Sequence, residues 1–112
     1  MTQQSKYTIE QFHELFHHFL MGKFEDDAQE VKVFIETAED VLPSTLNEYF
    51  GTVYASIYDI QDENEIESLR KKIKAHTVLK NIDKQEEPRY TEVLKWYRLF
   101  VKSLQKETAP VL

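Results

Sequence analysis

The histidines near the N-terminus are the residues with the clearest potential for chemistry. Positions 13 to 17 read HELFH, which fits the pattern H-E-x-x-H. In that pattern two histidines one helical turn apart bind Zn²⁺, and the glutamate between them is the general base of a zinc-dependent hydrolase. The spacing therefore identifies His13 and His17 as candidate metal ligands and Glu14 as the base that would activate a bound water.

A third ligand for such a site is present further along the chain. Eighteen residues separate His17 from Glu36, a spacing that resembles the placement of the glutamate ligand in one family of zinc aminopeptidases. That resemblance implies that Glu36 would complete the site formed by His13 and His17. Glutamate is abundant, however, with 14 of the 112 residues, so a glutamate at a preset spacing is expected often by chance.

The helical periodicity gives these histidines a simpler role. At 100° per residue, His13 and His17 fall on the flank of the apolar face that Phe12 and Phe16 define. The sequence contains no glycine-rich phosphate loop and no G-x-S-x-G motif. We therefore expect a non-enzymatic protein with no resident metal and no cofactor. A catalytic zinc site and adventitious metal binding at the surface are the alternatives.

Composition predicts one soluble domain that spans residues 1–112. Hydrophobic residues make up 41% and charged residues 30% of the chain, which is typical of a globular protein. There is no cysteine, no signal-peptide pattern, and no apolar run near the roughly 20 residues that span a bilayer. These features favour a cytoplasmic protein without membrane association. Residues 1–7 and 107–112 are expected to fray.

Apolar residues recur at helical spacing along most of the chain, and strict alternation is nowhere sustained. We expect an all-α fold, a single compact bundle of about five helices that start near residues 8, 27, 44, 62 and 88. Thr8 and Gln11 form a capping-box pair for the first helix, and Tyr7 and Phe12 can form a hydrophobic staple around it. Gly22 is a natural stop for this helix.

Two interruptions of the pattern set the other boundaries. Pro43 is expected to break the chain and Ser44 to cap the next helix. Residues 76–87 lose the periodicity and are expected to form a loop.

The same periodicity predicts the buried faces. Ile9 is expected to share the apolar face of the first helix. Val53 is expected on the third helix, and Tyr97 and Phe100 in the core face of the last one.

Charge is unevenly distributed along the chain. Residues 1–59 carry 3 basic and 11 acidic residues, a net charge of −8, whereas residues 60–112 carry 11 basic and 9 acidic residues, a net charge of +2. Such asymmetry suggests an anionic partner for the second half. Two basic stripes could follow a phosphate backbone. The candidate nucleic-acid-binding residues are Arg70, Lys71, Lys72, Lys74, Lys95, Arg98, Lys102 and Lys106. A solubilising polar face is the alternative for both stripes.

The second half also has a familiar layout. Its two segments read LPSTLNEYFGTVYASIYDIQDENEIESLRKKIKAH and PRYTEVLKWYRLFVKSLQ. This layout resembles the helical accessory module of bacterial restriction-endonuclease-type proteins. More distantly it resembles the core-binding domain of tyrosine recombinases, the phage-type integrases. Ser44, Tyr49 and the turn from Ile57 to Ile60 carry the match, which covers roughly residues 34–104.

The resemblance implies an accessory role in bacterial DNA metabolism or mobile elements, with duplex DNA as a possible partner and no catalytic residue. The chain departs from the recombinases because it lacks their catalytic Arg, His and Tyr domain and is acidic overall, with a net charge of −6. A second hypothesis is an interaction factor whose acidic first half mimics DNA and binds a basic protein partner.

Overall fold

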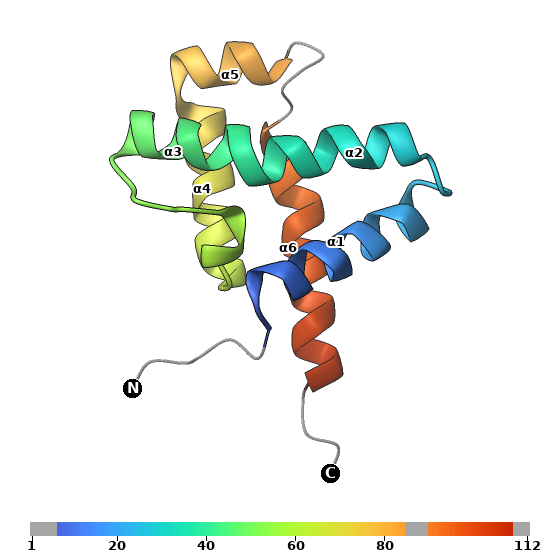
Figure 1. The fold of residues 1–112 in the computed structure, drawn as a ribbon. Coiled ribbons are helices and arrows are strands. Elements are labelled where there is room, and N and C mark those ends of the chain that lie inside the picture. Colours follow the sequence, from blue (N-terminus) through green and yellow to red (C-terminus); the bar gives the residue numbers. More distant parts are fainter. Residues whose placement is uncertain (1–6, 85–89, 109–112) are drawn as a thin grey trace.

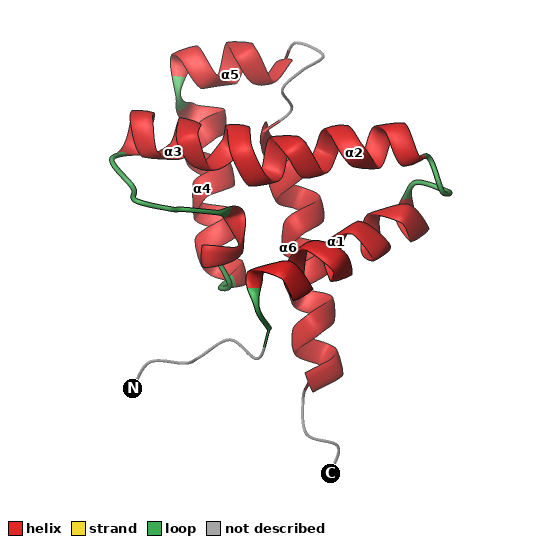
Figure 2. Ribbon diagram, in the orientation of Figure 1, coloured by secondary structure: helices red, strands yellow, loops and turns green. Residues whose placement is uncertain are grey.

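The computed structural model describes residues 7–84 and 90–108, with side chains for residues 7–82 and 90–104. Its helices are α1 (Ile9–Lys23), α2 (Ala28–Glu36), α3 (Leu42–Phe50), α4 (Glu63–Ala75), α5 (Thr77–Lys84) and α6 (Tyr90–Thr108). A π-helical turn, η1 (Thr37–Val41), joins α2 to α3, and a 3-10 turn, η2 (Ile57–Asp59), precedes α4. The predicted all-α bundle of about five helices is confirmed, and the described ranges contain no strand (Figure 2).

The helices form two crossing groups. Figure 1 shows α2, η1 and α3 as one long rod, with α1 on one side of it and α5 on the other. Helices α4 and α6 run steeply across this rod and antiparallel to each other, and they pack together closely. The core therefore lies where these two groups meet.

A cluster of aromatic rings fills the centre of this core. The ring centroids of Phe16 and Phe100 lie 5.0 Å apart, and those of Phe16 and Tyr97 lie 5.5 Å apart in an edge-to-face arrangement. Phe12 stacks on Tyr58 at 5.5 Å. All five side chains are buried, so the predicted burial of Tyr97 and Phe100 is confirmed. These contacts join α1, η2 and α6 into one unit.

The start of α1 follows the sequence pattern. The Thr8 hydroxyl accepts from the Gln11 backbone N–H at 3.1 Å, and the Gln11 side chain accepts from the Thr8 N–H at 2.8 Å. Tyr7 packs edge-to-face on Phe12, with 5.6 Å between centroids. The predicted capping box and hydrophobic staple are therefore both present. The helix ends one residue after Gly22, at Lys23.

The predicted break at Pro43 is wrong, because the chain stays helical from Ala28 to Phe50. Proline in a helix interior cannot donate to the carbonyl four residues earlier, and its ring crowds that carbonyl. The π-helical turn avoids both effects because its hydrogen bonds span five residues: the Leu42 N–H donates to the Thr37 carbonyl, five residues earlier. Ser44 is consequently an exposed helical residue rather than a cap.

The third predicted helix ends sooner than expected. Gly51 follows Phe50 in the left-handed conformation with φ of 68°, which suits glycine and stops the helix. The Asn47 side chain then fixes the next segment, since it donates to the Tyr54 carbonyl at 2.8 Å and accepts from the Tyr54 N–H at 2.9 Å. Val53 lies in this connection and is 93% exposed, which corrects the prediction that it belongs to a helix.

Residues 76–87 were expected to form a loop, but α5 occupies Thr77–Lys84. His76 starts this helix. Its carbonyl accepts from the Lys80 N–H at 2.8 Å, and its ring Nδ1 accepts from the Leu79 N–H at 3.3 Å. Leu79 is fully buried and anchors the helix to the core. The helix therefore forms without an apolar repeat, because the buried Leu79 and the cap at His76 stabilise it.

One apolar residue of α1 also departs from the prediction. Ile9 was expected in the core, yet its side chain is 56% exposed. It is the first residue of α1. Across the described ranges, no helix is long and apolar enough to cross a membrane.

Candidate functional site

The three candidate metal ligands are not assembled into a site. His17 and Glu36 are exposed, and the rings of His13 and His17 stack with centroids 6.4 Å apart. In the part of the chain that the structure describes, no three His, Asp or Glu side chains are grouped so that they could hold a metal ion. The spacing of His17 and Glu36 in the sequence therefore does not bring them together with His13 as ligands of one metal ion.

His13 instead contacts a different glutamate, Glu39. The Nδ1 atom of its ring forms a short hydrogen bond with the Glu39 Oε2 atom. The hydroxyl of Tyr58 donates to the same oxygen at 2.7 Å. One carboxylate from η1 thus links a histidine of α1 with a tyrosine of η2. Because Nδ1 is the atom that faces the carboxylate, Nε2 of His13 is left as the outward ring nitrogen.

The π-helical turn explains why Glu39 takes this position. A π turn places one extra residue in the helical register, and such turns are frequent at functional sites. Here Thr37 and Ala38 are buried on the core side, while Glu39 reaches toward α1 and η2. The geometric cause is Pro43, which α-helical hydrogen bonding cannot accommodate. A proline in the sequence therefore sets the position of the carboxylate.

A groove of about 490 Å³ opens beside this carboxylate. Its walls come from the start of α1, from η1 and from η2. The lining residues are Ile9, Glu10, His13, Glu14, Glu39, Ser56 and Tyr58. Three of these side chains are carboxylates, and no lysine or arginine is among the described residues that line the groove.

Tyr58 is a hydrogen-bond donor rather than a base in this groove. Its burial, and then its hydrogen bond to Glu39, raise the pKa of the phenol well above its ordinary value. The tyrosine therefore stays protonated and holds the carboxylate in place. The site offers a fixed negative charge with an imidazole beside it, and no nucleophile is placed between them among the described contacts.

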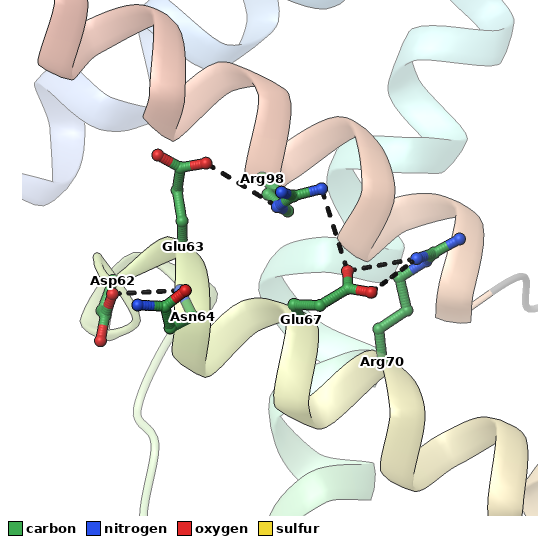
Figure 3. Close-up of polar contacts among 6 residues, drawn as sticks. All are labelled: Asp62, Glu63, Asn64, Glu67, Arg70 and Arg98. Atoms are coloured by element: carbon green, nitrogen blue, oxygen red, sulfur yellow. Dashed lines mark hydrogen bonds and ion pairs between the residues drawn. The ribbon is translucent and has the colours of Figure 1, made fainter.

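Two arginines of the predicted basic surface form ion pairs with glutamates of α4 (Figure 3). Arg98 of α6 reaches α4, with its Nε atom 3.8 Å from Glu63 and its Nη1 atom 4.0 Å from Glu67. Arg70 contacts both carboxylate oxygens of Glu67 at 3.2 Å. The Nε atoms of both arginines are shielded from solvent. Arg98 therefore connects α6 with α4, and Arg70 pairs within α4, so neither arginine is an unpaired cation for a phosphate backbone.

The lysines of the same stripes are placed differently. Lys71, Lys72, Lys74, Lys95 and Lys102 are exposed, and none forms an ion pair with another described residue. The Nζ atom of Lys72 lies 5.9 Å from the centre of the Phe50 ring, and that of Lys95 lies 5.6 Å from the Trp96 ring. The Lys106 side chain lies outside the described residues.

Trp96 lies at the margin of the core. Its ring packs edge-to-face on Phe24, with 5.3 Å between centroids, and the residue is partly buried. Leu99, which follows on the outer side of α6, is 38% exposed. The tryptophan therefore fastens α6 to the turn after α1.

Comparisons with known proteins found no match: no family model, no curated protein and no solved structure matches the chain. The resemblance to restriction-associated modules and recombinase domains therefore stays a prediction.

Sequence reasoning missed four residues that line the groove, Glu10, Glu39, Ser56 and Tyr58. It paired the histidines with Glu36 because that spacing was familiar, although Glu36 and Glu39 lie three residues apart on the same predicted helix. The available signal was Pro43, four residues after Glu39, since a proline there forces the helix to deviate at Glu39. No sequence rule would have connected Tyr58 to that deviation.

Proposed function

We propose that the protein is a non-enzymatic helical binding module of bacterial DNA metabolism or mobile elements, and that it contacts duplex DNA through α4 and α6. The observation that carries the proposal is the set of exposed lysines without an ion-pair partner among the described residues, Lys71, Lys72, Lys74, Lys95 and Lys102. A lysine that no carboxylate neutralises can replace a counterion at a phosphate. These lysines belong to the half of the chain with a net charge of +2.

The two arginines do not strengthen this contact. Arg70 is already paired with Glu67 within α4, and Arg98 is paired with Glu63 and Glu67 across the contact between α4 and α6, so moving either to a phosphate would break these ion pairs. The acidic first half also repels the same backbone. We therefore expect weak binding, with a Kd in the non-specific range of about 10⁻⁴–10⁻⁶ M at physiological salt.

The test is a titration of duplex DNA at several salt concentrations with three charge-matched double variants. The first carries Lys71→Gln with Lys74→Gln on α4, and the second carries Lys95→Gln with Lys102→Gln on α6. The control removes two exposed lysines of the first half, Lys23→Gln with Lys32→Gln. Each variant changes the net charge from −6 to −8. A difference in DNA affinity between the variants therefore depends on where the lysines lie and not on the total charge.

The expected result is a loss of affinity for the α4 and α6 variants and little change for the control. Each phosphate contact that is lost should lower the slope of log affinity against log salt by about 1. Equal binding by all three variants would show that α4 and α6 are not the contact surface. Absence of binding by the unmodified protein near about 50 mM salt, where phosphate contacts are strong, would reject the DNA role.

A second candidate function is an acidic factor that binds a basic protein. Ten of the eleven acidic residues in positions 1–59 are exposed, namely Glu10, Glu14, Glu25, Asp26, Asp27, Glu30, Glu36, Asp40, Glu48 and Asp59. Such a surface can imitate the charge of DNA. The test is competition for a lysine-rich histone bound to labelled duplex DNA: displacement of the DNA supports this function, and no displacement at low salt contradicts it.

A further inference from the structure

The groove beside Glu39 lies within the acidic first half, and its residues Glu10 and Glu14 also belong to the surface of the second candidate function. It lies on α1, η1 and η2, whereas the lysines proposed for DNA lie on α4 and α6. Phosphate is an unsuitable ligand here, because Glu10, Glu14 and Glu39 would repel it. A ligand for this groove must carry positive charge.

Glu39 offers a specific acceptor for such a ligand. Its Oε2 atom already accepts from Tyr58 and contacts His13, while its Oε1 atom has no partner among the described residues. Its side chain is 26% exposed, so the carboxylate is fixed and partly shielded. A charge-assisted hydrogen bond to a fixed and partly desolvated carboxylate is stronger than one to a mobile surface carboxylate.

The rim of the groove supplies an apolar surface. Ile9 lines the groove and is 56% exposed, although it was expected in the core. Long cationic side chains place their methylene stems on apolar surfaces and keep the charged head near polar groups. The combination of Ile9 at the rim and three carboxylates around the groove matches the shape of an arginine or lysine side chain.

We propose that this groove binds an arginine or lysine side chain that a basic segment of a partner protein presents. The methylene stem lies on Ile9, and the charged head donates to Glu39 Oε1, with Glu10 and Glu14 completing the negative surround. The guanidinium of arginine fits best, since its planar set of donors can reach two carboxylates at once. This proposal rests on the second candidate function, since it names the side chain that the acidic half would recognise, and it does not depend on DNA binding.

The test uses capped arginine, N-acetyl-arginine-N-methylamide, as the probe and the capped citrulline analogue as its neutral match. Backbone amide shifts of the intact chain are followed by NMR during each titration. Saturable shifts at Ile9, Glu10, Ser56 and Tyr58 are expected for arginine, with a Kd on the order of 1 mM, as the small size of the probe allows. Citrulline should leave these amides unchanged.

Two variants separate binding from folding. Glu39→Gln should weaken arginine binding at least tenfold. Because this change also alters the bonds to His13 and Tyr58, the double variant Glu10→Gln with Glu14→Gln provides a second measurement on exposed side chains, and it should weaken binding severalfold. The control is Glu36→Gln with Glu48→Gln, two exposed acids outside the groove, which should bind as the unmodified protein does.

Four results would overturn the proposal. The first is equal binding by the Glu10/Glu14 variant and its control, and the second is an equal response to citrulline. The third is binding of spermidine at these amides without binding of capped arginine, which would assign the groove to a small amine. The fourth is self-association that Glu39→Gln abolishes, which would make a second copy of the chain the occupant.

Discussion

At the scale of single residues, Glu39 of η1 is a carboxylate with partners in two other elements. It links α1 to η2 through His13 and Tyr58 and provides the acceptor of the groove. The H-E-x-x-H pattern lacks a third ligand among the described residues, because His13 and His17 are not grouped with a further His, Asp or Glu side chain that could hold a metal ion with them.

The zinc prediction follows from this geometry. Protein purified without a histidine tag is expected to contain well under one equivalent of Zn²⁺, measured by elemental analysis. His13→Ala should lower the free energy of unfolding by no more than about 1 kcal/mol, since the side chain is half-exposed. Stoichiometric zinc that disappears in His13→Ala would contradict this interpretation of HELFH.

A second residue-scale prediction concerns Tyr54. Its burial, followed by its hydrogen bond to Glu65, raises the pKa of Tyr54 to about 12 from an ordinary value near 10.0. The folded state then holds this proton more tightly than the unfolded state. The resulting stability is fully present below pH 10 and is lost as the pH rises through about 12.

Tyr54→Phe should therefore reduce the loss of stability between about pH 10 and pH 12, because it removes the group that titrates in that window. Urea unfolding at pH 8, 10 and 11.5 measures the effect. Tyr49→Phe is the control, since Tyr49 is 39% exposed and its hydroxyl has no hydrogen bond to a described residue. Identical pH dependence of the Tyr54 variant and the unmodified protein would show that Tyr54 is not linked to folding.

At the scale of elements, two glycines provide a direct test of the helix ends. Gly22 lies inside α1 and Gly51 follows α3 with φ of 68°, and an added Cβ would meet no atom within 4 Å at either position. Gly22→Ala should therefore stabilise the protein by about 0.5–1 kcal/mol through helix propensity. Gly51→Ala should destabilise it by about 1–2 kcal/mol, since alanine is strained in the left-handed region.

Urea unfolding of the two variants checks these opposite signs. Packing cannot account for a difference, because both sites are open, so each variant serves as the control for the other. A gain of stability at Gly51 would mean that the chain leaves the left-handed conformation there.

At the scale of the whole molecule, the described helices share one core. Trp96, the single tryptophan, packs on Phe24 and so reports the attachment of α6 to the turn after α1. The far-UV circular dichroism signal reports all helices together. For a single cooperative unit of this size, urea transitions followed by tryptophan fluorescence and by circular dichroism should coincide.

Transitions with separate midpoints would contradict a single cooperative unit. The least attached described element is α5, which buries one residue fully, Leu79. Leu79→Ala should broaden the circular dichroism transition if α5 then unfolds early, while leaving the fluorescence transition narrow. Val78→Ala, at a neighbouring position that is 47% exposed, is the matched control.

The sequence by itself determined the features that depend on local chemistry. The capping box at Thr8, the helix start near residue 62 and the core face with Tyr97 and Phe100 were all predicted, since each follows from residues within one or two helical turns. The all-α class follows in the same way from periodicity. The uneven charge along the chain could also be counted directly.

Only the tertiary structure decided where distant residues meet. Pro43 was expected to break the helix, but the chain stays helical through a π turn, and only the tertiary structure shows that this turn brings Glu39 to His13 and Tyr58. Arg98 meets Glu63 and Glu67 because α4 and α6 are antiparallel neighbours, which pairs Arg98 of the predicted basic surface with carboxylates. α5 forms without an apolar repeat because burial of Leu79 against the core stabilises it. In each case the deciding interaction joins residues far apart in the sequence, and local patterns hold no information about such pairs.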